Sequence, residues 1–294
     1  MVEGVQNGQD GQQNRRPGGQ TELPQDGQGG SPASGLLQAI TVAQNAAVQQ
    51  SLNGVRFAVY GQNKLAAGEL ERIVQAVPTA IAGALGNKVY YFVPLAMSAS
   101  PAARDHEHRG SSEETMISVA YTAELADQAI CHRNVTLGTD EGVFISTRLL
   151  NDRFALAFEF FINVGHAFVE TAGVPESFNK VVWEQALKDV RGETSQDAWE
   201  CRSQSLPQAL ASNETGAKLH VDEKARTDYL EAAFSDAVAI YLLSLSVDFN
   251  YSELREREYP LLAPQALAER LRLAAKLFPP NPGYEFAIRY RRRA

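Results

Sequence analysis

Four polar side chains interrupt one long apolar stretch of the chain, Phe154–Gly173, and they are the groups best placed for chemistry. At about 100° per residue, Glu159, Asn163, His166 and Glu170 fall on one side of a helix. An imidazole beside carboxylates can bind a metal ion or transfer protons. About 20 apolar residues can also span a membrane, but these polar groups favour a buried core helix. Each buried polar group then needs a partner, because burial without one costs about 1–3 kcal/mol.

The spacing around His166 resembles that of the helix that carries the HExxH signature of zinc peptidases. In that signature two His ligands lie one turn apart, and the Glu between them is the general base. Here Ile162 stands at the first ligand position and Asn163 at the general-base position, whereas Gly165 and His166 match the second half. An isoleucine cannot bind zinc, and a neutral amide cannot take a proton from water near neutral pH. The resemblance therefore implies a motif whose catalytic half is missing.

A later helix, expected over Asp222–Ser246, stands where such peptidases carry a distant acidic zinc ligand. The segment that begins at Asp228 resembles the acid-bearing segment of the anthrax toxin lethal factor family, whose first acid is the third zinc ligand. In that register Asp228 takes the ligand position, and Glu231 lies beside the place of the lost second acid. A shift of four residues puts Ala232 at the ligand position and Asp236 at the second acid. Both registers stay open.

Two arrangements of the site follow from this resemblance. In the first, His166, Asp228 and Glu231 hold a metal ion, with Glu170 as a further carboxylate one turn from the histidine. In the second, His166 is a core histidine hydrogen-bonded to Asp236 or Glu231, and no cofactor is expected. Both arrangements require the two helices to lie side by side.

Hydrophobic periodicity predicts an α+β fold around these helices. The order of strand, helix ending at a proline, strand, and a glycine-led strand before the central helix resembles the lethal-factor-like domain over about residues 55–280. The resemblance implies a zincin-like metallopeptidase fold, with a small mixed sheet, a buried active-site helix and a helical C-terminal half. We expect strands over 55–60, 88–93, 117–121 and 143–146, and helices over 36–52, 64–77, 154–173, 178–190, 222–246 and 264–278.

Two local signals concern the segments between the later helices. Ser177 can cap the helix expected over 178–190, because a serine side chain accepts a hydrogen bond from a first-turn N–H group. The polar segment Arg191–Val221 contains Gly and Pro, which predicts a long surface excursion.

The ends of the chain differ in composition. Residues 1–34 are rich in Gln, Gly, Asn and Pro, so they cannot bury enough apolar surface to fold and are expected to be disordered. Their composition resembles that of the export signals of bacterial type III secretion substrates, which implies secretion without a leader; otherwise the protein is cytoplasmic. Residues 35–294 are expected to form a single domain.

The composition of the whole chain excludes some classes of protein. At 44% hydrophobic and 21% charged residues it is typical of a globular protein, and two cysteines cannot form a disulfide framework. A net charge of −8 argues against a nucleic-acid binder.

The preferred hypothesis is a metallopeptidase-like domain of a secreted bacterial effector or toxin, catalytically degenerate and acting through a partner protein or peptide. An active zinc metallopeptidase with a rearranged ligand set is the first alternative, and in that case zinc is the cofactor. The second alternative is an unrelated α+β structural or interaction protein, in which the resemblance around His166 is a coincidence.

Overall fold

The described residues belong to one compact unit, Ser34–Ala294. The computed structural model describes residues 35–62, 66–98, 109–110, 114–126, 128–130, 132–147, 153–206, 221–254 and 259–288. The tail expected over residues 1–34 and the residue Cys131 lie outside the described residues. Strands and helices both contribute to the core, which confirms the α+β class, whereas the finer zincin-like fold stays a prediction.

A mixed sheet forms the first half of the unit. In the described part of the chain it has six strands, in the spatial order β2 (Gln49–Gln50), β3 (Arg56–Val59), β4 (Lys88–Val93), β9 (Asp140–Ser146), β8 (His132–Leu137) and β6 (Arg109–Gly110). The strands β3, β4 and β9 at its centre are parallel. The strands β2 and β8 run antiparallel to their neighbours β3 and β9, so the small mixed sheet expected from the sequence is present.

The central strand β4 is buried at every residue because helices cover both faces of the sheet. On one face, the ring of Tyr90 meets Phe160 of α5 (Arg153–Ala172) edge-on, with 5.0 Å between ring centroids. On the other face, Tyr91 belongs to a buried cluster that includes residues of α1 (Ala39–Asn45). Because successive side chains of a strand point to opposite faces, an unbroken apolar strand is the pattern that a doubly covered sheet requires.

A second, antiparallel sheet consists of β1 (Leu36–Gln38), β7 (Thr115–Ser118) and β5 (Leu95–Ser98), in that spatial order. It corrects the prediction of one helix over 36–52, of which only α1 is helical. The residues before α1 pair with β7, and those of β2 after α1 pair with β3. The pairing of β1 with β7 joins segments that are distant in the sequence, and β2 has only two residues, so local periodicity could not reveal either strand.

Short helices and turns complete this half. The expected helix over 64–77 is present as α2 (Ala67–Gln75). After Pro78 the chain forms the short helix α3 (Thr79–Ala82) and the 3₁₀ turn Gly83–Leu85. A further short helix, α4, covers Ala123–Ala126.

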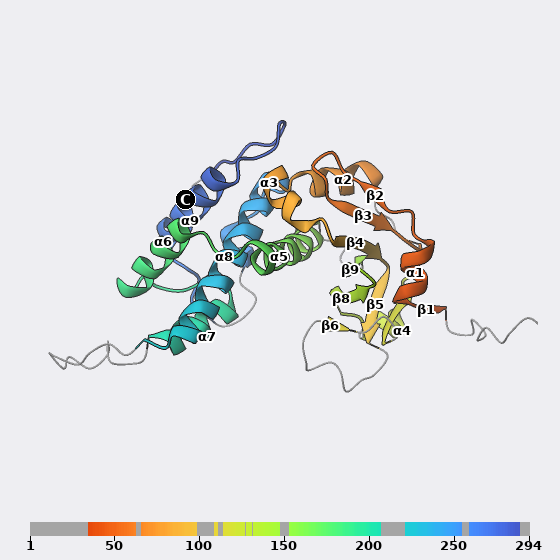
Figure 1. Cartoon of the computed structure of the whole chain (residues 1–294), viewed down its shortest axis with the longest axis horizontal. Helices are drawn as coiled ribbons and strands as arrows, with labels where there is room; N and C mark the ends of the chain where they lie inside the picture. The colour runs from red at the N-terminus through yellow and green to blue at the C-terminus, as the bar shows by residue number, and fades with distance from the viewer. Residues whose placement is uncertain are drawn as a thin grey trace, which may run out of the picture. The chain divides into compact units, whose positions relative to one another are not determined.

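The second half of the unit is helical, as the sequence predicts. Figure 1 shows the strands together on one side of the unit and these helices on the other, with α5 between them. They are α6 (Glu176–Leu187), α7 (Gln196–Ser205), α8 (Glu223–Ser246) and α9 (Pro264–Leu277), with a 3₁₀ turn at Tyr251–Leu254. Asp222 begins α8 by accepting hydrogen bonds from the N–H groups of Lys224 and Ala225.

Two local predictions in this half are wrong. Pro175 rather than Ser177 is the residue before α6, and no side chain caps that helix. The segment 191–221 is not a surface excursion throughout, because it contains α7, which Ser195 caps by accepting a hydrogen bond from the N–H of Ala198. Glu193 in the same segment is fully buried. Its polar sequence was misleading because its charges are paired inside the protein.

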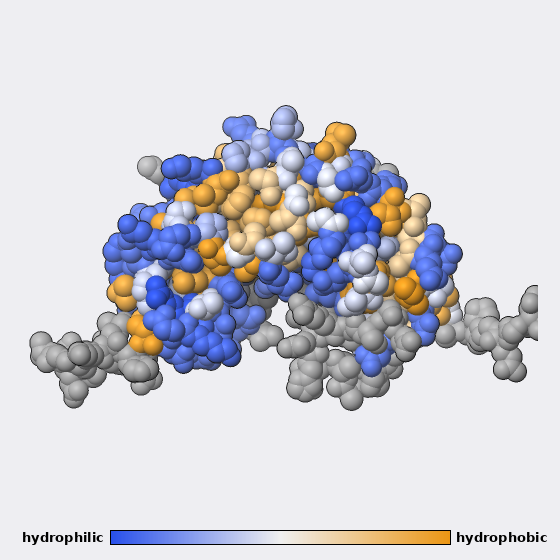
Figure 2. Space-filling view, in the orientation of Figure 1, coloured by the Kyte–Doolittle hydropathy of each residue, from blue (hydrophilic) through white to orange (hydrophobic). Residues whose placement is uncertain are grey.

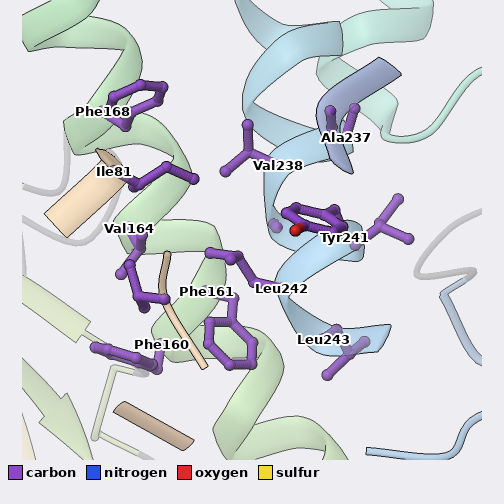
Figure 3. Packing of buried hydrophobic residues seen from close by; sticks show 14 of the residues in the cluster. Ile81, Phe160, Phe161, Val164, Phe168, Ala237, Val238, Tyr241, Leu242 and Leu243 are labelled. Atoms are coloured by element: carbon purple, nitrogen blue, oxygen red, sulfur yellow. The ribbon is translucent and has the colours of Figure 1, made fainter. Parts of the chain in front are cut away.

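The helices α5 and α8 pack against each other, and Figure 3 shows Val238 and Leu242 of α8 pointing toward α5. Their backbones approach each other closely at Gly165 of α5 and Ser235 of α8. A Cβ atom added at Gly165 would lie 2.6 Å from the carbonyl oxygen of Ser235. Glycine at this position is therefore explained by close helix packing, independently of any catalytic role.

Substitution of Gly165 by alanine should destabilise the fold by about 1–3 kcal/mol, because the new methyl group meets backbone that cannot rotate away. Gly68→Ala in α2 is the matched control, since a Cβ there has no heavy atom within 4 Å. The control should be neutral or stabilise by up to about 1 kcal/mol. Urea unfolding of both variants measures the difference. Equal stability of the two variants would contradict the close approach of α5 and α8.

Candidate functional site

The polar side of α5 is present as the sequence predicts. Glu159, Asn163, His166 and Glu170 lie within an arc of roughly 60° of the helix, because they recur every three or four residues. We call these four residues the α5 strip. Their exposure differs from the prediction: Asn163 is buried and Glu159 is half-buried, whereas His166 and Glu170 are exposed. The α5 strip is therefore open to solvent along part of its length.

The residues at the first ligand and general-base positions have other roles. Ile162 is half-buried and packs against the main hydrophobic core. The amide nitrogen of Asn163 donates hydrogen bonds to the backbone oxygen of Glu159 at 2.8 Å and to its carboxylate at 3.3 Å. A neutral amide that donates to a neighbouring carboxylate offers no base to a water molecule.

His166 is exposed, so the prediction of a buried core histidine is wrong. The reason lies in the helix geometry, because Gly165 faces α8 and the next residue is turned about 100° away from it. Glu170 at the end of the strip lies 3.5 Å from the ammonium group of Lys88, which also pairs with Glu141 at 2.7 Å. The strip thus makes contact with the sheet at this end.

The two acids expected to complete a metal site, Asp228 and Glu231, are exposed in the N-terminal half of α8. Asp228 lies near Cys201 of α7: burial is the main cause that raises the pKa of this free thiol, and the negative charge of Asp228 adds to it. In the described part of the chain, no group of three or more His, Cys, Asp and Glu side chains is placed to hold a metal ion. The ligand set of His166, Asp228 and Glu231 therefore has no geometric support and stays a prediction.

Asp236, the second acid of the shifted register, holds the segment before α7. Its carboxylate accepts a hydrogen bond from the hydroxyl of Thr194 at 2.8 Å and another from Ser195. Burial raises the pKa of Asp236 to about 6, because it outweighs these two hydrogen bonds, and the negative charges of Glu193 and Asp197 act in the same direction as burial. The partners of Asp236 are thus the hydroxyl groups of Thr194 and Ser195, and not the predicted His166.

A buried ionic network, which the sequence did not reveal, lies on another side of α8. The guanidinium group of Arg270 pairs with the carboxylate of Glu193 at 2.9 Å, and both side chains are fully buried. Tyr229 donates its hydroxyl to Glu193 at 2.6 Å, Arg202 donates to Glu193 at 3.3 Å, and Gln185 accepts from Arg270 at 2.8 Å. We call these five residues the Glu193–Arg270 network. One signal could have indicated it, because Arg270 falls within the apolar stripe of α9.

One helix in the described residues, α8, is long and apolar enough to cross a membrane. However, 72% of its most apolar window is buried inside the fold, as is typical of the core helix of a globular protein. No membrane span is established by this helix.

Comparison with known proteins gives no family: no family model, no curated protein and no solved structure matches the chain.

The raised pKa of Asp236 predicts a pH dependence of stability. A carboxyl group whose pKa is higher in the folded protein than its ordinary value of 3.8 stabilises the fold when protonated. This contribution is complete below the unfolded pKa and is lost as the pH rises through about 6. The free energy of unfolding should therefore be higher at pH 5 than at pH 7, by about 1 kcal/mol from this group.

Asp236→Asn isolates the effect, because asparagine keeps an acceptor oxygen for Thr194 and Ser195 but does not titrate. Denaturant unfolding at both pH values should show a smaller gain on acidification for the variant than for the unmodified protein. An identical gain in the two proteins would assign the pH dependence to other groups.

Proposed function

We propose that the folded unit is a metallopeptidase-like domain without zinc-dependent peptidase activity, which acts by binding a partner polypeptide. The arrangement of elements supports the likeness. A strand, a helix that ends before a proline, and a second strand precede the glycine-containing β9, which is followed by α5. The later helix α8 packs directly on α5, as a distant ligand on that helix would require.

The loss of activity is inferred from the identities of two residues, Ile162 and Asn163. A catalytic zinc takes three protein ligands and a water molecule that a base activates. At the position of the first imidazole ligand, Ile162 packs against the core. At the position of the general base, the amide of Asn163 donates a hydrogen bond to Glu159. No choice of acid on α8 replaces both groups.

The exposed carboxylates of α5 and α8 support the binding role. Glu170 of the α5 strip and Asp228 and Glu231 of α8 are exposed carboxylates, and the chain carries a net charge of −8. Carboxylates on an open surface attract cationic groups and speed the encounter with a positively charged partner. A partner segment that carries Lys or Arg is therefore the kind that these carboxylates would attract. The export role expected for residues 1–34 is a separate proposal, which fusion of those residues to a cytoplasmic reporter would test.

Metal content and activity test this function. The unmodified protein should purify with far less than one zinc ion per chain and should not cleave peptides, because Ile162 and Asn163 supply neither ligand nor base. Ile162→His should raise the affinity for zinc, since it adds an imidazole one turn from His166. Ile162→Gln is the matched control, because it adds polarity at the same half-buried position without a good zinc ligand. Elemental analysis and zinc titration compare the three proteins.

Two results would separate the alternatives. Stoichiometric zinc that is lost on His166→Ala would overturn the proposal in favour of an active metallopeptidase with a rearranged ligand set. Equal zinc affinity of the Ile162→His and Ile162→Gln variants would show that no ligand geometry survives around His166. The likeness would then be a coincidence, and an unrelated α+β interaction protein would be the better account.

A further inference from the structure

A cavity of about 470 Å³ lies away from the α5 strip, in the helical half of the unit. Its walls are the last turns of α8, the segment 247–251, the first half of α9, the segment 283–288, and Arg72 of α2. Pockets that bind small molecules usually measure about 300–1,000 Å³. The cavity is therefore large enough for a small-molecule ligand.

Most of the residues that line the cavity are apolar, and polar groups form the rest of its surface. Figure 2 shows apolar residues gathered over the C-terminal half of α8 on the face that it draws. The side chains that form most of the apolar wall are Ile240, Leu245, Phe249, Leu271, Phe286 and Ile288. A ligand whose body is an alkyl chain would bury apolar surface against these side chains, and each methylene group would contribute about 0.8 kcal/mol.

The wall formed by the C-terminal segment is held in place without a ligand. The side-chain amide of Asn281 donates to the backbone oxygens of Gln75 and Val77 at 2.8 and 2.7 Å. Tyr284 donates its hydroxyl to the backbone oxygen of Arg72 at 2.6 Å. The ring of Phe286 meets that of Tyr241 edge-on at 5.4 Å between centroids. Because these contacts hold the wall in place, the cavity is preformed, and a ligand does not lose binding free energy by ordering the wall.

One cationic group lies at the cavity and has no ion-pair partner in the part of the chain that the structure describes. Arg72 is exposed in the last turn of α2, and its guanidinium group pairs with no described carboxylate. Two acids also line the cavity: Asp248 is engaged in another interaction, and Glu285 is exposed. Arg72 is thus the group that an anionic head could neutralise.

We propose that this cavity binds a single-chain amphiphile with an anionic head, such as a fatty carboxylate, with the chain against α8 and α9 and the head at Arg72. This site is independent of the proposed function, because none of its residues belongs to the α5 strip or to the ligand set expected on α8.

Three probes with one alkyl chain and different heads test the proposal on the full-length protein. Decanoate, decanol and decylammonium are titrated by calorimetry below the concentrations at which they form micelles. Decanoate should bind once per chain, and decanol should bind about two- to fivefold more weakly, which is the size of an exposed ion pair. Decylammonium should bind most weakly. Absence of decanoate binding, or tighter binding of decylammonium, would overturn the proposal.

Two variants locate the binding. Ser244→Phe should abolish decanoate binding, because Ser244 lines the cavity and a phenyl ring there fills it. Ser203→Phe is the matched control, since Ser203 also donates its hydroxyl to a carbonyl of its own helix but lies exposed on α7. Arg72→Gln should reduce decanoate affinity about two- to fivefold and leave decanol affinity unchanged. Unreduced decanoate binding by folded Ser244→Phe, or by Arg72→Gln, would overturn the assignment of chain or head.

Discussion

The ion pair between Glu193 and Arg270 is fully buried, and the arrangement of the helical half depends on it. Removal of two charges from water costs several kcal/mol per ion, which mutual attraction offsets only when the remaining hydrogen-bonding groups are satisfied. Tyr229, Arg202 and Gln185 supply those hydrogen bonds from α8, α7 and α6. The pair itself joins α9 to the segment before α7. One charged contact therefore links the helices α6, α7, α8 and α9.

The backbone around Glu193 is also closely packed against the segment 260–262. Gly192 adopts a positive φ of 81°, and a Cβ atom there would lie 2.1 Å from the carbonyl oxygen of Leu261. The N–H of Glu193 donates to the backbone oxygen of Pro260, and the N–H of Leu262 donates to the backbone oxygen of Glu193, at 3.0 Å in each case. Thr194 and Ser195 then reach Asp236, so α8 is held at Tyr229 and at Asp236, two turns apart on one side. Ser235, the residue before Asp236, lies against Gly165 of α5.

The sequence predicted the elements whose signals are local and left out what depends on distant partners. The apolar run of β4 and the long helices α5, α8 and α9 follow from periodicity, and all are present. The strand β1 was missed because its partner lies far along the chain, and β2 was missed because two residues are too few to give a periodic signal. The polar side of α5 was predicted correctly, but the burial of His166 was not. Its exposure depends on which residue faces α8, and only the packing of Gly165 decides that.

The buried pair, and not any group on the α5 strip, holds the helical half together. A double-mutant cycle with Glu193→Met and Arg270→Met measures this most directly by denaturant unfolding. Each single change should lower the free energy of unfolding by about 3–5 kcal/mol, because it leaves a charge buried without its partner. The double variant should lose less than the sum of the two, since it removes both charges. Single losses below about 1 kcal/mol, or strictly additive losses, would contradict the account.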